Sequence, residues 1–295
     1  MFGLYFGNYL LEKNKISHSQ LEKVSLQQQT SRAKLGLIAV AEKLMTTKQA
    51  EEINELQKQK DNRFGDIAIE KGYLLKEEVT HLLNLQGNPY ITFVQTLVDN
   101  KILTMDKIDE YIKQFKDDYG FSDTEFEALK SGDIDRIIPV FVDINIPFAG
   151  ECISLTLRNI IRFINNKLLL KKAHTVNEYI FPSLAYQKLV GSHELFVGFA
   201  GNDPGLLTIA RTFAKEDFET MDEDAFDSIC EFINCSNGLY ASKLSLEDIH
   251  IDMTPPSYSQ NSTLVSDGDI YIVPVVINGK QLDLLVAVDQ NIEIK

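Results

Sequence analysis

Residues 221–245, MDEDAFDSICEFINCSNGLYASKLS, are the stretch from which the fold of this 295-residue chain is predicted. Thr220 precedes the stretch and Glu223 stands three residues later, which is the spacing of a capping box, so we expect a helix to begin there. Apolar residues then recur at the spacing of one helix face, namely Phe226, Ile229, Ile233 and Tyr240. This face is predicted to pack against a core.

The opposite face of the same helix carries, at steps of four, three and four residues, Asp227, Glu231, Asn234 and Gly238. A solvated helix face is the simpler interpretation, but asparagine and glycine are weak helix formers, and a glycine costs about 1 kcal/mol relative to alanine. A carboxylate and a carboxamide one turn apart, beside a residue without a side chain, suit a surface that another protein approaches closely. The Asn234 amide also offers both a donor and an acceptor, so it can orient a water molecule.

The pattern Asp227-x-x-x-Glu231-x-x-Asn234, followed by Pro255 and Pro256, resembles the active-site pattern of the CheC/CheX/FliY family of chemotaxis phosphatases. A single motif of this kind resembles CheX rather than CheC, whose members carry two. The order of segments agrees over residues 145–290, with a strand end GFAG at 198–201, the helix-like PGLLTIARTFA at 204–214, the helix of 221–245 and then strands.

The resemblance implies a phosphatase that acts on the aspartyl phosphate of a CheY-like response-regulator receiver. In this family the receiver holds the phosphoryl group and Mg²⁺, so no intrinsic cofactor is expected. Asn234 would position the attacking water and Glu231 would form a docking salt bridge, while Asp227 and Gly238 would border the contact. Two alternatives stay open: a non-catalytic adaptor for a receiver or a flagellar-motor component, and an output domain controlled by a cyclic di-GMP sensor. A homodimer formed by paired sheet edges is also left open.

The segments around this helix predict an α+β, CheX-like domain over residues 148–295, with a mainly antiparallel sheet and long helices. Asn278-Gly279 is a strong signal for a two-residue hairpin between two of the strands. The polar segment 257–268 is expected to be a mobile loop. We expect helices at 150–167 and 204–215, and extended segments or strands at 175–190, 194–200, 248–254, 269–277 and 281–288.

The first 115 residues contain a repeat with a period of 29 residues. Equivalent positions in its four units are occupied by Phe6, Leu35, Phe64 and Phe93. A fixed period of this length is typical of stacked supersecondary units, so an all-α repeat domain is predicted. Each unit is expected to form two short helices, the second preceded by a cap such as Ser17 with Gln20 or Thr46 with Gln49.

Basic, glycine and glutamine residues at constant places in this repeat resemble the MshEN domain, the N-terminal module of certain type II secretion and pilus ATPases. The resemblance covers residues 4–115 and implies binding of cyclic di-GMP, while the alternative is a helical docking or spacer module. Lys34 replaces the family's arginine and lacks its planar fork, and Leu37 stands where Asp66 stands in the next unit. The residues implied in binding are Lys34, Leu35, Gly36 and Gln57 in the second unit and Arg63, Phe64, Gly65, Asp66 and Gln86 in the third.

Residues 116–147 are predicted to connect the repeat domain, residues 1–115, to the C-terminal domain. Within this connector we expect a short helix at Asp123–Leu129 and a turn at Ser131–Asp133. The apolar run Ile137–Ile144, which Pro139 interrupts, is predicted to be strand-like.

Composition narrows the classes of function. The net charge is −14, and residues 121–295 hold 13 Lys and Arg against 26 Asp and Glu, which disfavours nucleic-acid binding by that part. No apolar run reaches the ~18 residues of a membrane span, and no signal peptide is recognised, so we expect a cytoplasmic protein. The three cysteines Cys152, Cys230 and Cys235 are expected to be free thiols, and no metal site is predicted.

Overall fold

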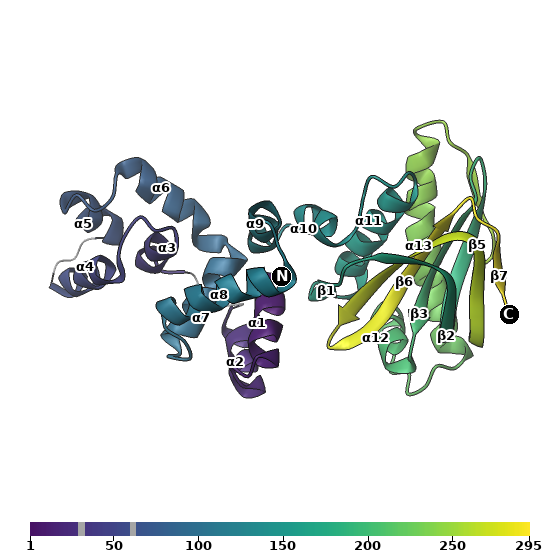
Figure 1. The fold of residues 1–295 in the computed structure, drawn as a ribbon, viewed down its shortest axis with the longest axis horizontal. Helices are drawn as coiled ribbons and strands as arrows, with labels where there is room; N and C mark the ends of the chain where they lie inside the picture. The colour runs from purple at the N-terminus through teal and green to yellow at the C-terminus, as the bar shows by residue number, and fades with distance from the viewer. Residues whose placement is uncertain (29–32, 60–62) are drawn as a thin grey trace. The chain divides into compact units, whose positions relative to one another are not determined.

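The structure is a computed structural model that describes residues 1–28, 33–59 and 63–295. Its chain separates into two compact units, residues 1–133 and 134–295 (Figure 1). Among the described residues, no helix combines the length and apolar character that crossing a membrane requires.

The first unit is helical, and its helices repeat in pairs as the period of 29 residues predicts. The second helices of the four pairs begin 29 residues apart, at α2 His18–Gln28, α4 Thr47–Gln59, α6 Lys76–Asn84 and α8 Met105–Tyr119. The first helices are α1 Phe2–Glu12, α3 Leu35–Ala41, α5 Phe64–Glu70 and α7 Pro89–Asp99, and a 3₁₀ turn spans Leu85–Gly87. Both predicted caps are present, since Ser17 and Thr46 exchange hydrogen bonds with Gln20 and Gln49.

A ninth described helix, α9 Asp123–Ser131, packs within this unit. Phe126 lies edge-on to Phe2, with ring centroids 6.0 Å apart, and Phe115 lies 5.5 Å from Phe121. The segment that follows Phe115 therefore contributes buried aromatic surface to the helical unit rather than hanging free as a linker.

The second unit combines helices with one antiparallel sheet, as its α+β pattern predicts. Its helices are α10 Ile134–Phe141, α11 Ala149–Asn159 with a π turn at Ile160–Ile164, α12 Asp203–Ala214 and α13 Glu223–Ser245. Its strands are β1 Leu168–Leu170, β2 His174–Gly191, β3 Leu195–Gly201, β4 Ile251–Met253, β5 Ser257–Ile277, β6 Lys280–Val288 and β7 Ile292–Ile294. The predicted hairpin joins β5 to β6, with positive φ angles at Asn278 (51°) and Gly279 (74°) that suit a tight two-residue turn.

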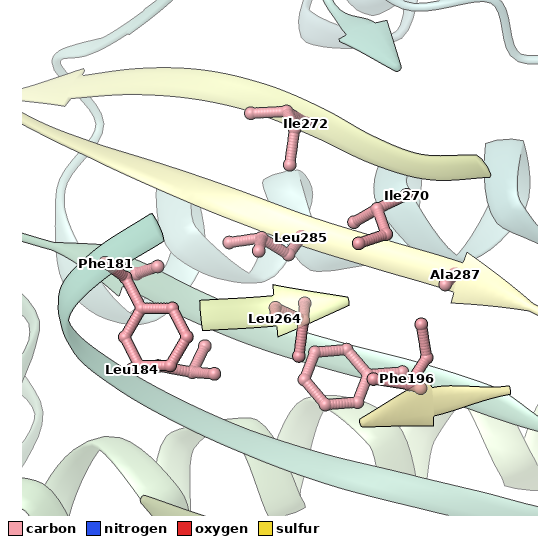
Figure 2. Packing of buried hydrophobic residues seen from close by; sticks show 10 residues of the cluster. Phe181, Leu184, Phe196, Leu264, Ile270, Ile272, Leu285 and Ala287 are labelled. Atoms are coloured by element: carbon pink, nitrogen blue, oxygen red, sulfur yellow. The ribbon is translucent and has the colours of Figure 1, made fainter. Parts of the chain in front are cut away.

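The four longest strands form a closed circuit of pairings. β5 pairs with β6, β6 with β3, β3 with β2, and β2 returns to pair with β5 between Ser257 and Ile272. Side chains on the enclosed face form a continuous apolar cluster, of which Figure 2 labels Phe181, Leu184, Phe196, Leu264, Ile270, Ile272, Leu285 and Ala287. Successive residues of a strand point to opposite faces, so Phe199 of β3 points the other way and meets Phe232 of α13, ring centroids 5.8 Å apart. The sheet thus packs against the buried face of α13.

Two expectations about this unit are wrong. Residues 257–268 are not a loop but the first half of β5, because β2 pairs antiparallel with this polar segment from Ser257 to Val265. Residues 137–144 are not strand-like: Ile134, Ile137, Ile138 and Phe141 follow helical spacing in α10, and Pro139 near its end removes only one backbone donor. The helix expected at 150–167 is present as α11 and the π turn, which ends at Ile164, three residues before the predicted end.

Candidate functional site

Helix α13 is a rigid support with one buried face, as predicted. Phe226, Ile229, Ile233 and Tyr240 are all at most 1% exposed. The cap differs from the prediction: Asp222, not Thr220, precedes the helix, and its carboxylate accepts a hydrogen bond of 3.0 Å from Ala225 N. A charged acceptor at this position also interacts favourably with the helix dipole, which explains why the helix begins two residues later than expected.

The opposite face of α13 presents the four predicted site residues together. Asp227 and Glu231 are exposed, and Asn234 and Gly238 are half-buried. Neither carboxylate forms an ion pair with a residue that the structure describes. Two acidic side chains are therefore available to a basic partner next to an asparagine amide.

The Asn234 side chain belongs to a hydrogen-bond network whose other members were not among the predicted site residues. Its Oδ1 accepts a hydrogen bond of 2.7 Å from Nε2 of Gln187, which lies fully buried on β2. The same Nε2 donates to the carbonyl of Thr254 at 2.8 Å, and Gln187 Oε1 accepts from Asn237 Nδ2 at 2.9 Å. Asn234 Nδ2 has no hydrogen-bond partner among the described residues, so this end of the amide is directed away from the network.

One buried atom of this network is left without a partner. Asn237 Oδ1 is buried and accepts no hydrogen bond from the described residues, and an unsatisfied buried acceptor costs about 1–3 kcal/mol. Two sequence signals could have indicated the network: Asn237 follows Asn234 by three residues on one helix, and Gln187 is a polar residue in the buried core of β2.

Gly238 is not required by the packing of this chain. A Cβ atom placed there would meet Met253 Cε at 3.6 Å, an ordinary van der Waals distance. Met253 and Leu239 are exposed to 39% and 45%, so they form an apolar border beside the polar residues of α13.

The first residues of β5, directly after Pro255 and Pro256, lie against the same helix. Cys230 Sγ is 3.6 Å from the carbonyl of Ser257, and Tyr258 stacks on Phe226 with ring centroids 4.3 Å apart. Burial, and secondarily the charge of Asp227, raises the pKa of the Cys230 thiol to about 11. This thiol stays protonated near neutral pH and is no nucleophile there.

Two of the nine residues predicted to bind cyclic di-GMP line a cavity in the helical unit. A cavity of about 180 Å³ is lined by Lys34 and Gly36 but by none of the other seven, which are Leu35, Gln57, Arg63, Phe64, Gly65, Asp66 and Gln86. Several of the nine have contacts within the helical unit instead. Lys34 Nζ pairs with Asp99 at 3.1 Å, and Gln86 Nε2 donates to the Ala33 carbonyl at 3.0 Å.

The two repeat glycines allow close approach of neighbouring helices. A Cβ on Gly36 would lie 2.8 Å from the Phe64 ring, and one on Gly65 would lie 2.7 Å from Val79 Cγ1. Both distances are shorter than real Cβ contacts, so helix packing alone explains why these positions hold glycine. The described residues contain no cluster of three or more side chains that could hold a metal ion.

Comparison with solved structures finds similar folds for about half of the chain. A CheC-like superfamily protein from Shewanella sp. PV-4 is 20% identical and covers 49% of this chain and 98% of its own, with a TM-score of 0.43. The chemotaxis protein CheX from Vibrio vulnificus is 14% identical and covers 50% and 99%, with a TM-score of 0.41. A chain of the CheX–CheY–BeF₃–Mg²⁺ complex from Borrelia burgdorferi is 16% identical and covers 49% of this chain and 99% of its own, with a TM-score of 0.35.

No curated protein matches the chain. The segment that carries Gln187, α13 and Thr254 does match a protein family. Residues 184–275 fit the family model described as CheX, chemotaxis phosphatase CheX.

Proposed function

We propose that the second unit accelerates hydrolysis of the aspartyl phosphate of a CheY-like receiver domain. The observation that carries this proposal is the placement of Glu231 and Asn234 one turn apart on the free face of α13, inside the segment that matches the CheX model. The match to a chemotaxis phosphatase family supports the class of reaction, and the residues of α13 support the way it is performed.

The catalytic contribution of α13 is positioning. Asn234 is held by Gln187 and offers a free amide end, so it can hold a water molecule in line with the phosphorus atom of a docked receiver. The receiver supplies the phosphoryl group and its Mg²⁺ as part of the substrate. No covalent step on this chain is needed, which agrees with the buried, protonated Cys230 beneath this face.

Glu231 serves docking rather than chemistry. Its exposed carboxylate, one turn before Asn234, can pair with a lysine or arginine of the receiver and so fix the register of the two surfaces. Asp227 adds a second charge on the N-terminal side of Glu231, and Leu239 and Met253 supply an apolar border.

The proposal is tested by loading CheY-type receivers with a small acyl phosphate and following phosphate release with and without the protein. Asn234→Ala should lower the accelerated rate roughly 100-fold, because the water loses its positioning group. Circular dichroism should be unchanged, since the side chain is only half-buried. Release by Asn234→Ala at the wild-type rate would show that α13 is not the catalytic element.

Glu231→Lys should instead raise the half-saturating receiver concentration roughly tenfold, or about 1.4 kcal/mol, with little change in the rate at saturation. The matched control is Glu216→Lys, an equal charge change at an exposed position in the connection between α12 and α13. Equal effects of both variants would assign the change to net charge rather than to docking.

The rival function is a binding module that holds a receiver or a flagellar-motor component without hydrolysis. The same assay separates the two functions. A receiver that binds in calorimetry, loses affinity with Glu231→Lys and yet shows no accelerated phosphate release would establish the adaptor.

A further inference from the structure

We infer that Gln187 is a positioning residue that determines which end of the Asn234 amide faces the partner, and that this end is the NH₂ group. The orientation follows from the hydrogen bonds alone, while its effect on rate rests on the proposed function. The site would then present a hydrogen-bond donor, not an acceptor, to the phosphoryl group and its water.

The backbone carbonyl of Thr254 fixes the orientation of the Gln187 amide. A carbonyl can only accept, so the Gln187 atom 2.8 Å from it must be the NH₂ nitrogen. Thr254 itself is fixed to β2, because its backbone N and its Oγ1 both donate to the Lys188 carbonyl, at 3.0 and 2.9 Å. The strand pairing of β4 with β2 therefore orients the Gln187 amide.

The orientation of Gln187 then determines those of its two neighbours. Its oxygen needs a donor, which Asn237 Nδ2 provides at 2.9 Å. Its nitrogen has a second hydrogen, and the atom 2.7 Å away on Asn234 must be an acceptor, hence Oδ1. The remaining end of Asn234, Nδ2, points out of the network as a free donor.

Burial makes this orientation durable. Gln187 is 0% exposed and Asn237 is 1% exposed, so water cannot replace either hydrogen bond if one amide turns over. Reversing Asn234 alone would place its NH₂ against the NH₂ of Gln187, and reversing Gln187 would place its oxygen against the Thr254 carbonyl. Each reversal leaves a buried repulsive contact in a region of low dielectric.

An outward NH₂ group assigns Asn234 a specific part in the reaction. It can donate to a phosphoryl oxygen or to the oxygen of the attacking water. As water attacks, a bond forms between its oxygen and phosphorus, the bond to the aspartyl oxygen breaks, and the electron pair stays on the aspartate. The water proton passes to the released phosphate, and Asn234 neither gains nor loses a proton.

The kinetic test compares Gln187→Met with a matched control. Methionine keeps the length of the side chain and removes the amide. We expect phosphate release at saturating receiver to fall roughly 10- to 100-fold while the half-saturating concentration stays within about twofold, because the water is held less well. In an Asn234→Ala background the same substitution should change the rate less than about twofold, since Gln187 acts through Asn234.

The control is Asn159→Leu. Asn159 is similarly buried and donates to Ser236 Oγ of α13 at 3.0 Å, but it has no hydrogen bond with Asn234. The Asn159→Leu protein should unfold at a lower temperature, as the Gln187→Met protein does, but it should release phosphate at the wild-type rate. A Gln187→Met protein that retains the wild-type rate, or an Asn159→Leu protein that loses as much, would overturn the positioning role.

A measurement on the wild-type protein tests the orientation without using activity or a variant. In NMR hydrogen exchange, both Nε2 protons of Gln187 should exchange at least about tenfold more slowly than the Nδ2 protons of Asn234, because only the former are buried and bonded. Equal protection of the two groups would refute the outward NH₂. Absence of phosphate release by the wild-type protein would refute the proposed function, and the exchange result would still decide the orientation.

Discussion

Glycine at position 238 lowers the stability of helix α13, and no packing contact within the chain requires a glycine there. Since a Cβ there would meet only Met253 at ordinary contact distance, the space above it is free for a partner. Gly205, at the start of α12, is the opposite case, because a Cβ there would collide with the Gln281 carbonyl oxygen. The two glycines look alike in the sequence and differ only in what faces them.

Gly238→Ala should therefore stabilise the second unit by about 1 kcal/mol, raising its thermal midpoint by roughly 2–4 °C, because alanine is the better helix former. If Gly238 borders the receiver contact, the same change should weaken receiver binding, measured by calorimetry. Gly205→Ala is the control and should lower the midpoint. A drop in the midpoint for Gly238→Ala would mean that the glycine has a packing role.

The buried Cys152 makes stability depend on alkaline pH. Burial raises the pKa of its thiol from an ordinary 9.0 to about 12, although a hydrogen bond with Thr156 offsets part of this rise. The folded state holds the proton more tightly, so the stabilisation is complete below pH 9 and is lost as pH rises from about 9 toward 12. Unfolding free energy should fall with pH in this window by up to about 1.4 kcal/mol per unit from this group.

Denaturant titrations between pH 8 and 10.5 check this expectation. Cys152→Val should make the dependence shallower, since the titrating group is gone. Cys235→Ser, which removes an exposed thiol, should keep the wild-type slope. Identical slopes for Cys152→Val and wild type would show that this thiol does not contribute.

The helix pairs of the repeat are built mainly by packing. Gly36 and Gly65 admit neighbouring side chains, and Gln28 and Gln86 donate to the backbone carbonyls of Pro89 and Ala33. These contacts explain several constant residues of the repeat without a ligand. Binding of cyclic di-GMP by the helical unit stays a prediction.

Calorimetry with cyclic di-GMP tests that prediction. If the nucleotide binds, Arg63→Ala should lower affinity at least about tenfold, because a charge-assisted hydrogen bond contributes about 1.5–3 kcal/mol. Lys34→Arg should tighten binding by restoring the planar fork, although it must also keep or replace the pair with Asp99. Absence of heat at micromolar nucleotide would leave the repeat as a docking or spacer module.

The boundary between the two compact units lies at a different residue from the predicted end of the repeat domain. We predicted a repeat domain ending at residue 115, yet Phe121, Phe126 and Leu129 are at most 6% exposed within the helical unit. Each such side chain contributes about 1.5–3 kcal/mol when buried. A boundary near residue 133 keeps these contributions in one piece.

Separate pieces 1–133 and 134–295 should each fold, the first mainly helical and the second mixed, as judged by circular dichroism and cooperative unfolding. A piece 1–115 should unfold at a clearly lower denaturant concentration than 1–133, because it lacks the buried side chains of α9. Equal midpoints would contradict this. Limited proteolysis that cuts within residues 20–110 before the segment 116–147 would contradict a compact helical unit.

Local periodicity was enough for the features that depend on neighbours in the chain. Four such features were predicted from the sequence, because residues a few positions apart meet in a helix or a turn. They are the apolar stripe of α13, its exposed face with Glu231 and Asn234, the 29-residue repeat and the Asn278-Gly279 hairpin. The prediction was wrong for α10, where the residues follow helical spacing but the run that contains Pro139 was expected to be strand-like.

Features that depend on contacts between residues far apart in the sequence could be identified only in the tertiary structure. The first half of β5 is polar and looks like a loop, and it became a strand because β2 lies beside it. The Gln187 amide meets Asn234 and Thr254 across 47 and 67 residues, so no local pattern could pair them. Hydrogen bonds between distant segments depend on strand register and helix placement, which arise when the core forms. The candidate residues were therefore visible in the sequence, whereas the orientation of the Asn234 amide was decided by the tertiary structure.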